Sequence, residues 1–301
     1  MWRLVDVRRF TPEDVPFAAD LLAARPNAHP LAAPYDPVVE LSALLDAGAT
    51  GWVVPGAGFM VGAIDAYGAW SQYAGHAAAD VATYRHLYRA IARDWVDAGE
   101  RRHCVVLPEG DAVAGEAFAN LAFGREHVFA LASLASQPAD APSLDVRVGT
   151  LDDFDALRPL FSGVARHLTE PPCFSPRTAA YYDGLDADFR EDIEDPQTTY
   201  FVARVDGRDA GFAVWEPMPQ RIRVPDGAFA LSHMSVAPDV RGRGVGHALT
   251  LAGLALARER GCTVTWSDWR LTNMDAEPHW RRYGWTPYCV RMTRRVEPDP
   301  D

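Results

Sequence analysis

An internal repeat limits how this chain of 301 residues can fold more than any other feature of its sequence. Three short patterns each occur twice and in the same order: Arg-x-x-Thr-x-x-Asp at 8–14 and 147–153, an aromatic residue followed by Val at 52–53 and 201–202, and a longer helical pattern at 111–123 and 273–285. The spacing between matching positions grows along the chain, whereas chance matches would scatter. We therefore expect a duplicated domain whose second copy has longer loops.

The segment between the copies is small, polar and punctuated by proline, which is typical of a linker. It divides the chain into a first domain at 1–134, a linker at 135–144 and a second domain at 145–301. Strand and helix patterns alternate in the second domain. Asp206-Gly207 indicates a tight turn between two strands, and apolar residues at helical spacing predict a helix over 244–260 that Gly261 ends.

Composition argues against several kinds of partner. The net charge of -12 opposes binding to nucleic acid, which requires a positive field. No stretch reaches the roughly 20 apolar residues of a membrane span, and no cationic leader precedes an apolar segment at the N-terminus. The four cysteines are scattered singly, so neither a zinc site nor a disulfide framework is expected. We expect a cytoplasmic protein, monomeric or homodimeric, that binds no metal.

The segment Arg241-Gly242-Arg243-Gly244-Val245-Gly246 lies between an expected strand at 229–236 and the expected helix. Backbone N–H groups at a helix N-terminus are unpaired and carry partial positive charge, and glycine lets the backbone approach a ligand closely. The spacing fits neither a nucleotide triphosphatase loop nor a dinucleotide-binding fingerprint. From the residues alone, the segment is either an anion site or a glycine-rich loop that only caps the helix.

Two motifs together resemble those of the GNAT superfamily of acetyltransferases. The first is Arg241-x-x-Gly244-x-Gly246, preceded by Met234-Ser235-Val236, which is similar to the family's acyl-CoA motif. The second runs from Asn273 to Trp285 and is similar to the family's closing motif at matching spacing. The resemblance covers residues 145–295, and together with the repeat it identifies the chain as a tandem member.

The resemblance implies an α/β fold in which helices flank a mixed, mostly antiparallel sheet, with two tandem acyl-CoA N-acyltransferase-like domains. It also implies a sheet that splays open between its fourth and fifth strands and holds acetyl-CoA in the opening. The pyrophosphate would lie on the loop amides, the cofactor arm would pair with the upstream strand, and an Asn would hold the arm from the other side. The implied cofactor-binding residues are Met234, Ser235, Val236, Arg241, Gly242, Arg243, Gly244, Val245, Gly246 and Asn273.

The first copy lacks the features of this loop. The spacing between Asp111 and Asn273 matches the Arg and the two glycines of the motif to Ala79, Ala82 and Tyr84. These residues offer neither a guanidinium nor a close backbone approach. We therefore interpret 1–134 as a degenerate copy, with an enzyme that has two sites as the alternative.

Acetyl transfer to an amine requires a base, a stabilised oxyanion and a proton for the leaving thiolate. His233, on the strand that enters the loop, is the candidate base, because imidazole suits proton transfer near neutral pH. Glu216 is the reserve. The family commonly places a Tyr acid seven residues after the Asn, but Trp280 stands there, so Tyr283 is the remaining candidate acid.

These observations predict an N-acetyltransferase that moves an acetyl group directly from acetyl-CoA to a primary amine of a small molecule. Aromatic residues in the segment 173–186 are candidates for lining the acceptor pocket. An acetyltransferase for protein or peptide N-termini and a non-catalytic acyl-CoA sensor are the alternatives.

Overall fold

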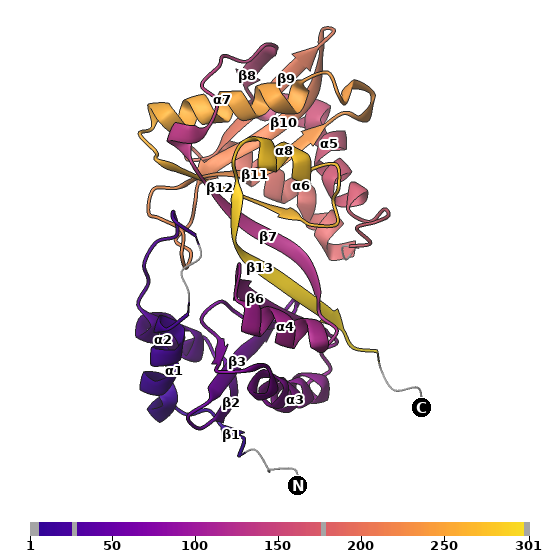
Figure 1. Ribbon diagram of the computed structural model, residues 1–301. Coiled ribbons are helices and arrows are strands. Elements are labelled where there is room, and N and C mark those ends of the chain that lie inside the picture. Colours follow the sequence, from indigo (N-terminus) through magenta and orange to yellow (C-terminus); the bar gives the residue numbers. More distant parts are fainter. Residues whose placement is uncertain (1–5, 26–28, 176–178, 298–301) are drawn as a thin grey trace. The chain divides into compact units, whose positions relative to one another are not determined.

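The computed structural model describes residues 6–25, 29–175 and 179–297 (Figure 1). The chain forms two compact units. The first unit comprises 1–128 together with 287–301, and the second unit comprises 129–286. The chain therefore passes between the units twice, at 128–129 and again at 286–287.

Each copy of the repeat begins with a short strand and two helices, followed by a β-rich half. Up to its first passage the chain forms β1 (Arg8–Arg9), α1 (Val15–Ala23), α2 (Pro37–Asp46), β2 (Thr50–Val54), β3 (Gly58–Asp65), β4 (Gly68–Ser71), β5 (His76–Ala78), α3 (Val81–Asp97), β6 (Arg102–Pro108), α4 (Ala112–Asn120) and β7 (Gly124–Ser133). The rest forms β8 (Asp145–Val148), α5 (Phe154–His167), α6 (Ala179–Glu194), β9 (Thr199–Val205), β10 (Arg208–Pro217), β11 (Phe229–Val236), α7 (Val245–Glu259), β12 (Val264–Arg270), α8 (Glu277–Arg282) and β13 (Thr286–Arg295). Single-turn 3-10 helices lie at Pro12–Asp14, Leu134–Ser136, Leu151–Asp153 and Pro238–Val240.

The two element orders match one for one when β4 and β5 together are compared with β11. The pairing registers agree with the match: Arg8 lies opposite Val53 between β1 and β2, and Arg147 lies opposite Val202 between β8 and β9. The repeat detected in the sequence is therefore a repeat of structure. This confirms the predicted fold class of two tandem α/β domains with largely antiparallel sheets.

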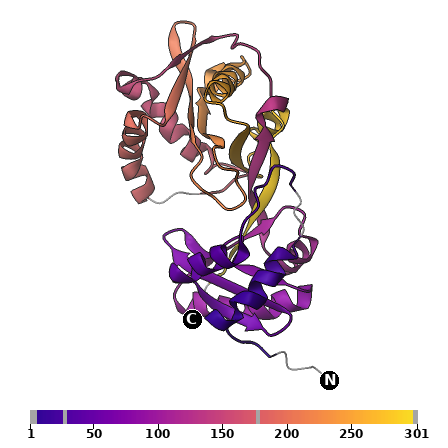
Figure 2. The same cartoon turned by 90° about the vertical axis from the view of Figure 1, so that its left-hand side faces the viewer.

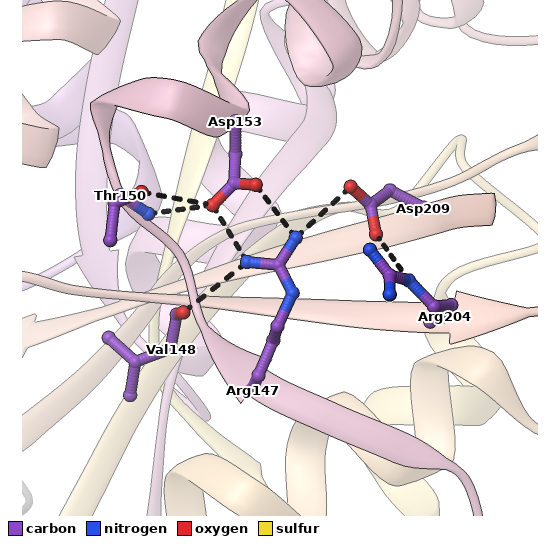
Figure 3. A network of polar contacts seen from close by, with 6 residues as sticks. All are labelled: Arg147, Val148, Thr150, Asp153, Arg204 and Asp209. Carbon is purple, nitrogen blue, oxygen red and sulfur yellow. Dashed lines mark hydrogen bonds and ion pairs between the residues drawn. The ribbon is translucent and has the colours of Figure 1, made fainter. Parts of the chain in front are cut away.

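The recurring Arg-x-x-Thr-x-x-Asp pattern fastens the first strand of each copy to the start of its first helix. Arg147 donates two hydrogen bonds of 2.7 Å to the carboxylate of Asp153, and the backbone N–H of Thr150 donates to the same carboxylate at 2.8 Å (Figure 3). Arg8 and Asp14 form the same bidentate pair in the first copy, at 2.7 and 2.6 Å. The pattern is conserved between the copies for structure rather than for catalysis.

The last strand of each copy completes the sheet of the other unit. In the first unit the strand order is β1-β2-β3-β4-β6-β13, and β13 pairs with β6 antiparallel from Cys289 opposite Pro108 to Arg295 opposite Arg102. In the second unit the order is β7-β12-β11-β10-β9-β8. The division of the copies at 135–144 stays a prediction, and because of this exchange the compact units have other limits. Gln137, inside the predicted linker, is also buried, and its side chain bonds to Thr265 and to the carbonyl of Tyr283.

Helices cover both faces of the sheet in the second unit. In Figure 2, α7 is seen nearly along its axis on one side of the strands, with α5 and α6 on the other. On the α5–α6 side, Phe161, Phe189 and Phe212 pack together with ring centroids 4.1–5.8 Å apart. On the α7 side, Gly253 lies against the indole of Trp215, which is fully buried.

The sheet of the second unit opens between β11 and β12. These parallel strands pair only from Phe229 to Leu231, opposite Thr265 to Ser267, although β11 continues to Val236 and β12 to Arg270. An extra residue, Ser232, falls at a bulge opposite β10, where the register shifts. A bulge bends and twists its strand, so the end of β11 leaves its neighbour. The predicted opening between the fourth and fifth strands is thus present.

Candidate functional site

A groove with a volume of about 630 Å³ lies in the second unit where β11 and β12 separate. Four parts of the chain form its walls: the end of β11, the loop and first turn of α7, the segment from Asn273 through α8, and the last turns of α5. The lining residues are Gly163, Val164, His167, Met234, Ser235, Val236, Val240, Arg241, Gly242, Gly244, Val245, Gly246, His247, Asn273, Asp275, Ala276, His279, Trp280 and Arg282.

The N-terminus of α7 opens into this groove without a side-chain cap. Its N-cap is Gly244, with φ of 84°, and no side chain accepts a hydrogen bond from the first turn. Gly242 also has a positive φ, of 78°, a conformation that residues with a Cβ rarely adopt. The first N–H groups of the helix are therefore left for an anionic ligand, as the loop sequence indicated.

The two arginines of the loop have different surroundings. Arg243 is paired with Asp206 in the β9–β10 turn, with Nη1 2.7 Å from the carboxylate, and does not line the groove. Arg241 is exposed, lines the groove, and has no ion-pair partner among the residues that the structure describes. Both arginines were expected to bind the cofactor; the geometry leaves Arg241 available and gives Arg243 another partner.

The end of β11 presents an unpaired backbone edge to the groove. Within the described ranges, Met234, Ser235 and Val236 pair with β10 on one side and with no strand on the other. Their side chains alternate in direction: Met234 faces Thr250 of α7, and Ser235 lies near Gly163 of α5. An extended ligand can therefore pair with this edge as an added strand would.

The wall opposite β11 is built from Asn273 and α8. Asn273 Oδ1 lies 3.3 Å from His167 Nε2, so this contact joins the wall to α5. His279 Nε2 lies 3.0 Å from the hydroxyl of Thr250, and burial, followed by the nearby charges of His247 and Arg282, lowers the pKa of His279 to about 4. His279 is therefore neutral at pH 7 and adds no positive charge to the groove.

None of the three predicted catalytic side chains lines the groove. His233 is exposed on the α5–α6 side of β11, with its ring 5.7 Å from that of Phe189. Glu216 is half-buried near the end of β10. Tyr283 is 1% exposed and its hydroxyl is hydrogen-bonded to His247 Nδ1; burial raises the pKa of the phenol.

Trp280 occupies the groove wall at the position where a Tyr acid was sought. Its indole stacks on Trp269, with ring centroids 6.4 Å apart and planes 25° apart. In the segment predicted to line the acceptor pocket, 176–178 lie outside the described residues. Tyr181 and Tyr182 of α6 lie edge to face at 5.6 Å, and Tyr181 packs against the core under α5.

In the first unit, a side chain caps the helix N-terminus that matches the start of α7. The N-cap of α3 is Asp80, whose carboxylate accepts a hydrogen bond of 2.7 Å from the N–H of Thr83. This bond lowers the pKa of Asp80 and occupies the place that an anion would need. Asp80 and Gly244 are the N-caps of the matching helices, so Asp80, and not Ala82, corresponds to Gly244. The match expected from the sequence is two residues out of register at this point.

A buried ion pair holds the residue that matches Asn273. Arg25, just after α1, donates from Nε to Asp111 at 3.2 Å and from Nη1 to the carbonyl of Tyr73 at 2.8 Å. The exposed fractions of the Arg25 and Asp111 side chains are 8% and 11%. Tyr73 lies in the kink between β4 and β5, which take the place of β11. In the first unit, side chains of the chain itself therefore bond to the helix N-terminus and to the residue that matches Asn273.

Several groove residues were not identified from the sequence, namely His167, His247, Asp275, His279 and Arg282. His167 belongs to α5, which reaches the groove through tertiary packing, and the other four lie inside or next to the two motifs at positions that the motifs do not specify. A helical His gives no signal of its own, because the same pattern suits a solvated face. No group of three or more potential metal ligands occurs in the described part of the chain, and none of the described helices is long and apolar enough to cross a membrane.

Comparisons with known proteins agree with this geometry. Residues 165–285 match the model of the acetyltransferase (GNAT) family. Streptothricin acetyltransferase of Streptomyces lavendulae is 29% identical over 160 residues, which are 52% of this chain and 80% of that protein.

Two solved structures share the fold along nearly the whole chain. A GCN5-related N-acetyltransferase from Sphaerobacter thermophilus has a TM-score of 0.60 and 17% identity, covering 98% of this chain and 97% of that one. A tandem GNAT protein from the clavulanic acid biosynthesis pathway has a TM-score of 0.53 and 14% identity, covering 98% of this chain and 100% of that one.

A sheet that opens beside an uncapped helix N-terminus, in the second of two domains with the same order of elements, is typical of acyl-CoA N-acyltransferase folds. Residues 165–285, in the second of the two tandem domains, belong to the acetyltransferase (GNAT) family, and the protein is an N-acetyltransferase. Enzymes of this family use acetyl-CoA.

Proposed function

We propose that the second unit binds acetyl-CoA in the groove and transfers its acetyl group to a primary amine of a small molecule. One observation carries the proposal: the groove joins two open hydrogen-bonding surfaces, the N-terminus of α7 and the free edge of β11. An anion site continuous with an edge for an extended arm fits a ligand with a pyrophosphate and a pantetheine chain.

Different residues bind the pyrophosphate and the pantetheine arm of the ligand. The amides from Gly244 to Gly246 and the guanidinium of Arg241 face the pyrophosphate, which carries the negative charge that this helix end favours. The backbone of Met234 to Val236 pairs with the amide groups of the arm. Asn273 approaches the arm from the opposite wall.

His233 remains our candidate for the base. It is next to Met234 on β11 but on the face covered by α5 and α6, so an amine that enters from that face meets the imidazole beside the free strand edge. Burial raises the pKa of the nearby Asp192 carboxyl and the charge of His233 opposes this rise, so the two groups interact.

The bound thioester supplies the acetyl group, and the chain's own residues orient the two reactants and accept the amine proton. Tyr283 is buried and bonded to His247, and Trp280 has no acidic proton. We therefore assign no side chain as the proton donor to the leaving thiolate. Glu216 stays the reserve base. The 29% identity to an enzyme named for streptothricin supports a small-molecule acceptor over a protein N-terminus.

Binding and turnover test this proposal separately. Coenzyme A should raise the melting temperature, because a ligand bound only to the folded state stabilises it. Acetyl-CoA and a panel of small primary amines should then release free thiol. The His233→Ala variant should keep the thermal shift and lose most turnover. The absence of any shift at millimolar coenzyme A would refute the proposed groove, and full turnover by His233→Ala would remove His233 as the base.

A further inference from the structure

A histidine on α5 forms the contact that joins α5 to the α8 wall of the groove. His167 is the last residue of α5, and its Nε2 lies 3.3 Å from Oδ1 of Asn273, which follows β12. Both side chains are half-buried and both line the groove. No motif and no part of the proposed reaction assigned a role to His167.

The chemistry of the two groups fixes the direction of this hydrogen bond. An amide oxygen can only accept, so His167 Nε2 carries the proton and donates. The Asn273 amide is then held with its oxygen toward α5. Its Nδ2 group, which has no partner among the described residues, keeps both N–H donors for a ligand in the groove.

The first copy supports the importance of this position. There Asp111 matches Asn273, and it too is held by a donor from the C-terminal end of the copy's first helix, Arg25. In the first copy the pair is ionic and buried, and Arg25 also donates to the carbonyl of Tyr73, in the turn between β4 and β5. In the second copy an imidazole and an amide form the pair, and the strand edge stays open. The same bridge therefore occurs in both copies with different chemistry.

We infer that His167 is a positioning residue for acyl-CoA: it orients the amide of Asn273 so that Nδ2 donates to a carbonyl of the pantetheine arm. This inference rests on the proposed function, because the arm belongs to the ligand proposed there. His167 acts through Asn273 and contacts the nucleotide part of the ligand at no point.

The test compares two ligands on the full chain by isothermal titration. Coenzyme A spans the whole groove, whereas adenosine 3′,5′-diphosphate lacks the arm and interacts only with the α7 end. His167→Leu should weaken coenzyme A binding about tenfold, the loss of roughly one hydrogen bond, and leave the affinity for adenosine 3′,5′-diphosphate unchanged. His167→Gln should bind like the wild type, because its amide nitrogen can replace Nε2 as the donor.

A double-mutant cycle with Asn273→Ala completes the test. Once Asn273 is removed, His167→Leu should cause no further loss of coenzyme A affinity. Multiplicative losses, equal losses for both ligands, or wild-type binding by His167→Leu would each overturn the inference. A wild-type protein that binds neither ligand would instead overturn the proposed function, and the inference with it.

Discussion

At the scale of single residues, two arginines of the same loop motif make different contacts. Arg241 and Arg243 are two positions apart and both are exposed, yet only Arg241 lines the groove. Arg243 is bonded to Asp206, and this contact raises the pKa of Arg243 and lowers that of Asp206. The sequence motif cannot distinguish them, because the partner comes from a turn 37 residues away.

This difference leads to a matched pair of variants. Arg241→Gln should weaken coenzyme A binding about tenfold at low salt, since it removes a charge-assisted bond to phosphate. Arg243→Gln should change the affinity less than twofold. The loss for Arg241→Gln should shrink as ionic strength rises, because an exposed charge is screened. Titration at two salt concentrations measures both effects; equal losses for the two variants would contradict the assignment.

At the scale of elements, the position of α7 on the sheet depends on a residue without a side chain. A Cβ built on Gly253 would lie 1.9 Å from Cε2 of Trp215, and the indole is buried with no room to move. Gly253→Ala should therefore destabilise the protein by about 1–3 kcal/mol through overpacking, despite the better helix propensity of Ala. Urea denaturation measures the change.

Gly184→Ala on α6 is the control for that variant. Its added Cβ would meet only Asp188 Oδ2, at 3.9 Å, so the substitution should be neutral or stabilise by a few tenths of a kcal/mol. A stable Gly253→Ala variant would show that α7 can shift on its sheet.

The ion pair between Arg147 of β8 and Asp153, at the start of α5, should make the free energy of unfolding depend on pH. The hydrogen bond from Arg147, then that from the Thr150 amide, lowers the pKa of Asp153 in the folded state. Its contribution is complete above the ordinary Asp pKa of about 3.9 and is lost as the pH falls through the lower folded-state value. Asp153→Asn should cost about 1–3 kcal/mol at pH 7 and much less near pH 2, whereas Asp152→Asn, an exposed neighbour, should cost little at either pH. A pH-independent cost for Asp153→Asn would contradict this origin.

Local chemistry made several elements predictable from the sequence. The Asp206-Gly207 turn has φ of 51° and 80°, Gly261 ends the long helix with φ of 72°, and α7 begins one residue after the start that its glycines indicated. The position of the first copy's helix start was less predictable. The alignment of the copies relied on the match between Asp111 and Asn273. Asp80, the N-cap of α3, is a local signal for the helix start, but a search for the glycines of the loop motif does not detect it.

At the scale of the whole molecule, the duplication was predictable but the exchange of strands was not. β7 and β13 occupy matching places in the order of elements of the two copies, and the choice between β6 and β12 as a partner depends on contacts far apart in the chain. For the same reason the sequence could place the loop and the Asn273 motif in one site, but not His167 or His279. The boundaries of the two copies, with the first ending at 134 and the second beginning at 145, stay a prediction.

The exchange should hold the protein together even when its covalent link is cut. A protease recognition site inserted between Asp140 and Ala141, both exposed, would allow cleavage into 1–140 and 141–301. The first fragment carries β7, which lies beside β12, and the second carries β13, which pairs with β6 over seven residue pairs. Strands inside a sheet cannot leave without exposing unpaired backbone groups.

The two fragments should therefore elute together from a size-exclusion column in native buffer and separate in denaturant. Two separate native peaks would mean that β13 and β7 do not hold the units in the way that their pairing indicates.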